Sequence, residues 1–500
     1  MKYTGEFYNE GADKTNKKPI EVKEEIMKKA LSLLLASVML LTCLAACGNS
    51  STPSGNSDTP PATAQTGGAP ETGSGEPAAL EGEITFWHSF TQGPRLETIQ
   101  AAANQFMTDN PGVKITIETF SWADFYTKWT TGLASGNVPD MSTALPNHVV
   151  EMIDADAIIP MDNLIDSMGR DRFYEAPLVE MTAEDGHCYA VPLYSHAQVM
   201  WYHKDLLEKY NLEVPTTWDE LYEASKIITE GEGGNAYGTS VPMGTNDMMA
   251  TRFLNFYVRS AGETLLTEDG KANLTSQAAI DGINYWVKVY KDCSPTDSIN
   301  FNVLDQATLY YTGKICFDYN SGFQIGGVET NAPELLDQID CAPMPTINKG
   351  DPQVGYETSN IPMVIWKNSA HPEICEAFIK YLYEPENYVP FLLSVPVGML
   401  PALKEIADNE QFLSDPMVQK FSHAKDVISK AVGEGTAIGM ENGPRPEAGL
   451  LTSQGVIESM FQDIVINGTP VEQAAKAAED KLNDLFETCL LYTSPSPRDS

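Results

Sequence analysis

The chain has 500 residues, of which 42% are hydrophobic, and its 69 acidic and 32 basic residues give a formal net charge of −37. This length corresponds to two or three domains at about 150 residues each. The large excess of acidic residues argues against nucleic-acid binding, because the phosphate backbone is bound by Lys and Arg. We interpret the charge as a well-solvated surface rather than as a catalytic feature.

The eight cysteines give no indication of a metal site. None forms a Cys-x-x-Cys pair, and no cluster of Cys and His has the spacing of zinc ligands, so we expect neither a metal nor a cofactor. We expect most of the cysteines to be small buried hydrophobic side chains, and a single disulfide stays open.

An export signal is indicated near the start of the chain. Met27-Lys28-Lys29 precedes an apolar run over residues 30–44, which is shorter than the roughly 20 residues of a membrane-spanning helix but fits the core of a signal peptide. The run ends in Leu44-Ala45-Ala46-Cys47, which resembles the lipobox of bacterial lipoproteins. The resemblance implies cleavage before Cys47 and a lipid on its sulfur, so we expect residues 27–46 to be a lipoprotein signal peptide. The alternative is an ordinary signal peptide that ends beside a cysteine.

The segments around this signal do not have the pattern of a folded domain. Residues 1–26 are polar and precede a complete signal, and residues 489–500 break off a helical pattern, so we interpret both as non-native extensions. Residues 48–79 contain no aromatic and no large aliphatic side chain, so they cannot bury enough apolar surface to offset chain entropy. We expect residues 47–80 to be the lipidated cysteine followed by a flexible linker.

The body of the chain alternates between two periodicities. Strands are predicted at 83–90 and 113–118, and helical spacing runs from Leu96 to Met107 and from Trp122 to Leu133. The order strand, helix, strand, helix predicts an α/β fold.

The same alternation continues further along the chain. A capping box formed by Thr217 and Glu220 marks the start of another helix. Further strands are predicted at 189–194, 199–203, 314–319 and 361–366, and further helices at 371–385 and 471–486.

Three stretches together resemble the extracellular solute-binding proteins of ABC importers, in the large carbohydrate-binding group called family 1. They are "ITFWHSF" (84–90) followed by "NPGVKITIE" (110–118), "GLASGNVPDM" (132–141), and the stretch from "YAVPLY" to "KIIT" (189–229). The family has Asn in a Tyr-Asn-Lys-Asp element where this chain has His203, a position that we interpret as structural. The resemblance covers residues 83–487.

The resemblance implies a two-lobe, periplasmic-binding-protein-like α/β fold of type II, with a ligand cleft between lobes that close by hinge motion. The first lobe would hold residues 82–193 and 358–396, and the second lobe would hold residues 196–356 and 397–487.

Candidate ligand-binding residues follow the ends of predicted strands, where ligands of open α/β sheets bind. Sugars pack their C–H faces on aromatic rings, and their hydroxyls need hydrogen-bonding partners in a shielded cleft. The resemblance adds Asn147, Tyr194 and the stretch 319–323, and each candidate has a purely structural role as its alternative. The expected set is Ser89, Gln92, His88, Asn147, Tyr194, Met243, Asn246, Tyr319, Asn320, Phe323, Tyr356 and Arg445.

The resemblance therefore predicts the substrate-binding component of an ABC importer, lipid-anchored to the outer face of the cell membrane. It would capture a sugar or oligosaccharide between its lobes and deliver it to the membrane permease. The expected partners are the carbohydrate, the permease subunits and, through the lipid on Cys47, the membrane. We expect a monomer that binds no nucleic acid.

The alternatives are a binding protein for a non-sugar solute or for a sensor system, and a secreted enzyme that acts on glycosides. A pair of carboxylates would suit a glycosidase, but 69 acidic residues make some pair inevitable. The chain has no Gly-x-Ser-x-Gly and no His-Glu-x-x-His motif, and "GEGGNA" (231–236) follows a predicted helix, the wrong context for a dinucleotide loop. We therefore expect no enzymatic activity.

Overall fold

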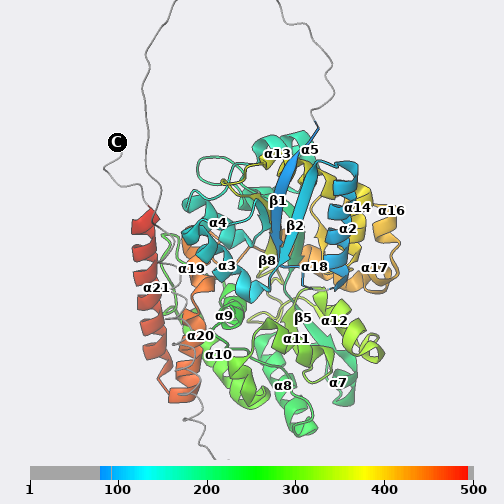
Figure 1. Cartoon of the computed structure of the whole chain (residues 1–500). Coiled ribbons are helices and arrows are strands. Elements are labelled where there is room, and N and C mark those ends of the chain that lie inside the picture. The colour runs from blue at the N-terminus through cyan, green and yellow to red at the C-terminus, as the bar shows by residue number, and fades with distance from the viewer. Residues whose placement is uncertain (1–78, 92, 494–500) are drawn as a thin grey trace, which may run out of the picture. The chain divides into compact units, whose positions relative to one another are not determined.

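The structure is a computed structural model that describes residues 79–91 and 93–493 (Figure 1). The side chains of Ala123 and of residues 489–493 are outside this description. The predictions for residues 1–26, for the signal peptide, for Cys47 and its linker up to residue 78, and for Gln92 all fall on residues outside it.

A six-stranded mixed sheet organises the first lobe, with the strand order β2-β1-β3-β8-β4-β9. β1 pairs in parallel with β2 and β3, and β8 pairs antiparallel with β3 and β4. The strands are β1 (Gly82–His88), β2 (Val113–Thr119), β3 (Met141–Thr143), β4 (Val191–Ala197), β8 (Thr358–Ile365) and β9 (Leu400–Pro401). The helices of this part are α2 (Gly93–Asp109), α3 (Trp122–Ser135), α4 (Pro146–Asp154), α5 (Asp162–Met168), α6 (Glu175–Glu180), α13 (Pro372–Leu382), α14 (Pro385–Leu393), α15 (Lys404–Ala407) and α16 (Glu410–Leu413).

A three-stranded antiparallel sheet organises the second lobe, with β5 between β6 and β7. The strands are β5 (Val199–His203), β6 (Phe317–Asn320) and β7 (Ile339–Ala342). The remaining helices are α7 (Lys204–Lys209), α8 (Trp218–Glu232), α9 (Met249–Ser260), α10 (Gln277–Cys293), α11 (Val303–Tyr311), α12 (Phe323–Asn331), α17 (Pro416–Lys420), α18 (Ser422–Glu434), α19 (Pro446–Ser453), α20 (Val456–Gln462) and α21 (Val471–Thr493).

Each sheet has a hydrophobic core of its own. The first core takes residues from the ranges 84–194 and 361–412, and the second takes residues from 200–356 and 438–486. A further cluster, which includes Trp201, Leu400 and Ile428, packs α18 over the region where the chain passes between the two sheets. The mixture of helices with parallel and antiparallel strands confirms the predicted α/β class.

Residues just past the predicted end of the first lobe pack with that lobe. Leu400–Pro401 pairs with β4 in the six-stranded sheet, and Met399, Leu403 and Phe412 pack in the first core. We therefore propose that this lobe runs to about residue 412 rather than ending at residue 396. The resemblance assigned residues 397–412 to the second lobe, and their weak strand and helix signals gave no reason to place them elsewhere.

The predicted start of α8 is present with one difference. Thr217 Oγ1 accepts a hydrogen bond from the Glu220 backbone N–H at 3.2 Å, as a helix N-cap should. The Glu220 carboxylate accepts hydrogen bonds from the backbone N–H and the hydroxyl of Thr216, at 2.9 and 2.8 Å. In a capping box this carboxylate would accept from the backbone N–H of the N-cap residue, Thr217, but here it accepts from Thr216, the residue before the N-cap.

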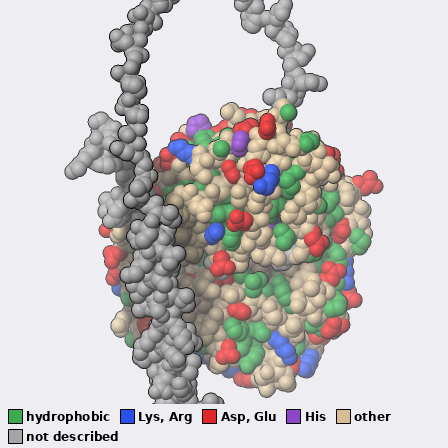
Figure 2. All heavy atoms as spheres, in the orientation of Figure 1, with side chains coloured by type: hydrophobic (Ala, Val, Ile, Leu, Met, Phe, Trp, Pro, Cys, Tyr) green, Lys and Arg blue, Asp and Glu red, His purple; other side chains and the backbone are tan. Residues whose placement is uncertain are grey.

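Cysteines and charges follow the sequence-based expectations in the described part of the chain. Its five cysteines with described side chains are buried free thiols: Cys188, Cys293, Cys316, Cys341 and Cys375. His203 is buried with Nε2 2.9 Å from the carbonyl oxygen of Tyr310, which is a structural role. Asp and Glu side chains are scattered over the visible face, with Lys and Arg side chains between them (Figure 2).

A buried carboxyl in the second lobe makes the stability of the protein depend on pH. Glu458 Oε1 accepts hydrogen bonds from the backbone N–H and the hydroxyl of Thr251, both at 2.9 Å. Burial nevertheless raises the pKa of Glu458 to about 7. The folded protein therefore binds this proton more tightly than the unfolded chain does.

We expect the stabilisation from this protonated carboxyl to be complete below the pKa of an ordinary glutamate and to be lost as the pH rises through about 7. Glu458→Gln should reduce the fall in the free energy of unfolding between pH 5 and pH 8 by up to about 3 kcal/mol. Urea denaturation at several pH values measures this, with Glu472→Gln on the exposed face of α21 as control. Equal pH dependence in Glu458→Gln and the parent would contradict the assignment.

Candidate functional site

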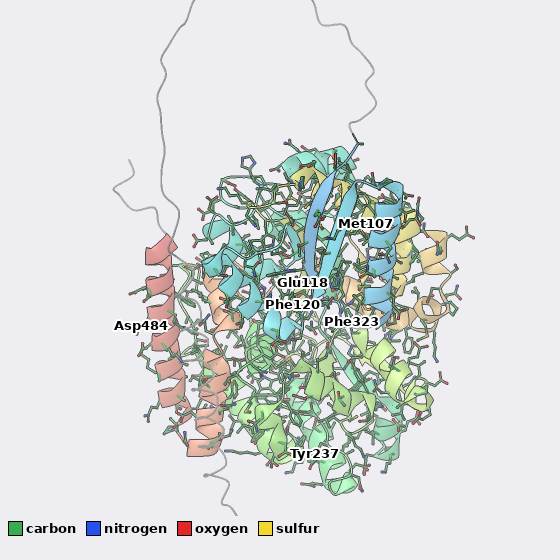
Figure 3. The ribbon with its side chains drawn as sticks, viewed as in Figure 1. Met107, Glu118, Phe120, Tyr237, Phe323 and Asp484 are labelled. Carbon is green, nitrogen blue, oxygen red and sulfur yellow. The ribbon has the colours of Figure 1, made fainter. Side chains whose placement is uncertain are left out.

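A cavity of about 450 Å³ lies between the two lobes. From the first lobe, the cavity wall takes residues that follow β1, the first turns of α3 and α4, and parts of β4 and β8. From the second lobe, it takes the loop before α9, the first turns of α9 and α11, the β6–α12 connection and the end of α19. Phe323, at the start of α12, lies where the elements of the two lobes meet (Figure 3). The cavity therefore lies where the carboxyl end of β1 faces the second lobe.

Five of the predicted site residues line this cavity: Ser89, Tyr194, Asn246, Asn320 and Phe323. Asn147 lines a smaller adjoining cavity of about 30 Å³. Its Nδ2 donates to Thr452 Oγ1 at 2.5 Å, so this amide is engaged by α19. Gln92, another predicted site residue, lies outside the described residues.

Two predicted residues in the second lobe face its core instead of the cavity. Tyr319 is fully buried and packs against Phe253 and Trp286, at centroid distances of 5.0 and 5.6 Å. Successive side chains of a strand point to opposite faces, so when Asn320 faces the cavity its neighbour Tyr319 faces away. Met243 is also fully buried in this core.

The other three predicted residues are engaged by the protein itself. The His88 ring stacks on Phe90 and accepts a hydrogen bond from the Phe90 backbone N–H at 3.1 Å. Tyr356 is buried in the second core. Arg445 donates to the carbonyl oxygens of Thr267 and Glu268, at 3.0 and 3.2 Å. None of the three lines the cavity, and we do not retain them, or Tyr319 and Met243, as candidates for contact with a ligand.

The sequence analysis missed two aromatic residues of the cavity wall, Trp122 and Tyr126 on α3. The helical spacing from Trp122 to Leu133 does not distinguish rings that face the cavity from rings that face the core. Phe125 and Trp129 are buried, but Trp122 and Tyr126 are half-exposed. Two aromatic pairs with i, i+4 spacing on one short helix therefore mark two faces, one for the core and one for the cavity.

Arg95, at the start of α2, was also missed. Its guanidinium lies between the rings of Phe90 and Phe323, with Cζ 4.7 and 4.8 Å from the two centroids, and its Nη1 donates to the Tyr194 hydroxyl at 3.1 Å. A guanidinium between two aromatic faces is held by cation–π attraction. Phe323 comes from the second lobe, so this stack joins the two lobes at the cavity.

Arg252, on α9, is the second arginine of the cavity wall. Its Nε lies 2.7 and 3.0 Å from the two carboxylate oxygens of Glu357, which is 2% exposed. Glu357 precedes β8, on the segment that returns the chain to the first lobe. The ion pair therefore fixes the wall of the second lobe to a crossing segment.

Several polar atoms of the cavity wall are buried and have no hydrogen-bond partner among the described residues. They are Ser89 Oγ, His148 Nδ1, His196 Nδ1 and Gln198 Oε1. Burial lowers the pKa of both His148 and His196 to about 3, and the charges of Arg252 and Arg95 add to this effect at His196. Both imidazoles are therefore neutral, so each has one nitrogen that donates and one that accepts.

An unpartnered buried polar atom costs about 1–3 kcal/mol. The atoms of this kind in the cavity wall can pair with a ligand that brings its own hydrogen-bonding groups. In the described part of the chain, no cluster of His, Cys, Asp and Glu is arranged to hold a metal ion, and no helix there is long and apolar enough to span a membrane.

The sequence profile of the bacterial extracellular solute-binding proteins matches residues 92–389. The chain belongs to this family. The resemblance recognised in the sequence is thus confirmed, and the family is one of binding proteins. One relative of this solute-binding protein is an arabinooligosaccharide-binding protein of Halalkalibacterium halodurans, which is 24% identical over 67% of this chain and 74% of the relative. Another is a maltotriose-binding protein of Pyrococcus abyssi, which is 22% identical over 69% of this chain and 71% of the relative.

Solved structures resemble this solute-binding protein along nearly their whole length. An ABC transporter solute-binding protein of Thermotoga lettingae, solved with α-D-tagatose bound, has a TM-score of 0.70 and 20% identity, over 80% of this chain and 99% of that protein. At this level of identity the likeness shows the fold alone. It confirms the two-lobe, periplasmic-binding-protein-like architecture.

The Arg252–Glu357 ion pair gives a stability prediction for this solute-binding protein. Glu357→Gln leaves the Arg252 charge without its buried partner, so the free energy of unfolding should fall by about 3–5 kcal/mol. The double variant Arg252→Met with Glu357→Gln should regain part of this loss, because it buries no unpaired charge.

Urea denaturation of the two variants and the parent measures the effect, with Glu334→Gln on the exposed surface as control. A double variant less stable than Glu357→Gln would show that the pair is not the cause.

Proposed function

We propose that this solute-binding protein captures a sugar or oligosaccharide in the cavity between its lobes. The observation that carries the proposal is the composition of the cavity wall. Rings of Trp122, Tyr126 and Phe323 stand beside buried polar atoms that have no partner among the described residues. Aromatic faces suit the C–H faces of a sugar ring, and its hydroxyls both donate to and accept from neutral imidazole and amide groups.

The relatives support this class of solute, because their names specify arabino-oligosaccharides and maltotriose. The wall comes from both lobes, so a bound sugar would contact both of them only when they are close together. Such a ligand shifts the equilibrium between open and closed lobes towards the closed state by its differential affinity. The closed form would then dock on a membrane permease, and the protein itself would carry out no chemical step.

The proposed function also includes export and lipid anchoring at Cys47. A lipid on this sulfur and the linker that follows it would hold the lobes near the outer face of the cell membrane. Two or more acyl chains would be needed, since a single chain binds a membrane only marginally.

A panel of mono- and oligosaccharides, including arabinotriose and maltotriose, tests the solute class. At least one sugar should raise the melting temperature, because a ligand that binds only the folded form stabilises it. Trp122→Ala should weaken binding of that sugar about tenfold or more, which corresponds to about 1.4 kcal/mol.

Isothermal titration calorimetry measures the affinities. Tyr174→Ala is the matched control, since Tyr174 is an exposed aromatic residue outside the cavity wall. No response to any sugar of the panel, or equal losses in the two alanine variants, would count against a sugar stacked in this cavity.

Expression of the full chain in a bacterium supplied with radiolabelled palmitate tests the anchor. The parent should carry label and sediment with membranes, whereas Cys47→Ser should carry no label and appear in the soluble fraction. Cys188→Ser is the control, because Cys188 is buried and should leave labelling unchanged. Label on Cys47→Ser would exclude Cys47 as the acylated residue.

A further inference from the structure

A segment near the C-terminus, residues 436–453, contacts both lobes and is called the strap below. On the side of the second lobe, Ile438, Leu450 and Leu451 are part of the second core. Charged groups fix the same side, since Arg259 Nη1 lies 3.2 Å from Glu441 Oε1 and Arg445 donates to the carbonyl oxygens of Thr267 and Glu268. The strap is thus an integral part of the second lobe.

The strap also packs directly on the first lobe. Glu180 on α6 accepts a hydrogen bond from the Ala437 backbone N–H at 3.2 Å, and Asn147 on α4 donates to Thr452 at 2.5 Å. Between these bonds lies a small apolar cluster formed by Val150, Ala437, Met440 and Ala448. α19 of the strap lies beside α4, on the same side of the molecule as α20 and α21, whereas α2 and α12 lie on the other side (Figure 1).

The contact between α4 and α19 depends on a glycine. A Cβ atom at Gly449 would lie 1.8 Å from Glu151 Oε1, far inside the distance that two such atoms tolerate. Gly449 has an ordinary helical backbone, so the need for glycine comes from the approach of Glu151 and not from the conformation of the chain. At this spacing of the two helices, a side chain at position 449 would require Glu151 or one of the helices to move.

The same contact reaches the wall of the cavity. Glu151 Oε2 accepts a hydrogen bond from the Tyr126 hydroxyl at 2.8 Å, and the Tyr126 ring lines the cavity. Thr452, which accepts the hydrogen bond from Asn147, lines the cavity as well. Glu151 is therefore a positioning residue that accepts a hydrogen bond from a cavity-lining ring on one side and lies against Gly449 of the strap on the other.

We propose that the α4–α19 contact is a latch at one edge of the cavity, which limits how far the lobes separate and holds Tyr126 in place for a bound solute. The proposal rests on the proposed function in that it takes this cavity to be the solute site. Separation of the lobes at this edge lowers the population of the arrangement that presents both walls to a solute. The apparent affinity falls with that population.

The distance between the lobes in the absence of any sugar tests the latch. Spin labels are attached to the full chain at Gln105 on α2 and Asn284 on α10, both exposed, through a genetically encoded ketone amino acid so that no cysteine is modified. Pulsed electron paramagnetic resonance then gives the distribution of distances between the two lobes. Gly449→Ala should shift this distribution to longer distances than in the parent.

Two further variants separate the latch from a general loss of structure. Gly433→Ala lies in α18, where an added Cβ has no neighbour within 4 Å, and it should leave the distribution unchanged. Glu151→Ala combined with Gly449→Ala removes the group that the new Cβ meets, so the distribution should return towards that of Glu151→Ala alone. An unchanged distribution in Gly449→Ala, or no recovery in the double variant, would overturn the proposal.

Thr452→Val serves as a second route if Gly449→Ala does not fold. It removes the hydrogen bond from Asn147 at nearly constant volume, and it should lengthen the interlobe distance by less than Gly449→Ala would. No lengthening in Thr452→Val would likewise overturn the latch.

For any sugar of the panel that binds the parent, Gly449→Ala should raise the dissociation constant about fivefold or more. If no sugar binds but the distances shift as expected, the latch stands and the proposed solute class fails. If sugars bind and the distances do not shift, the solute class stands and the latch fails.

Discussion

The division of the apolar side chains into two separate hydrophobic cores is the constraint on which the other features of this protein depend. Each core stabilises its own sheet, and the cavity between the lobes is lined by polar groups and aromatic edges. Because the carboxyl end of β1 and the residues after β6 both lead to this region, loop and first-turn side chains of the two lobes face one cavity.

The contacts across this region fall into two kinds. The Arg95–Phe323 stack and the α4–α19 packing join side chains of different lobes, whereas the Arg252–Glu357 pair fixes the second lobe to a crossing segment. Ser89 Oγ and Gln198 Oε1, by contrast, have no hydrogen-bond partner among the described residues. This combination gives the lobes a defined relation to each other and leaves hydrogen-bonding capacity for a solute.

Sequence reasoning located most strands and helices because their periodicities are strong, and it placed candidates after strand ends. Ser89, placed after a strand end, reaches the cavity, as do Tyr194 and Asn320, which the resemblance added. The sequence could not decide between Tyr319 and Asn320, since the face that each residue of a short buried strand presents depends on which lobe packs on it. Arg445 donates to backbone carbonyls of another loop, a contact that no local sequence pattern indicates.

The sequence by itself determined the α/β class, the family and the acidic, well-solvated surface, because these follow from periodicity, motif order and composition. Only the tertiary structure decided which aromatic face of α3 meets the cavity, that Leu403 and Phe412 pack in the first core, and that Gly449 lies against Glu151. These features depend on contacts between segments far apart in the chain, such as α4 with α19. Local patterns carry no information about such distances.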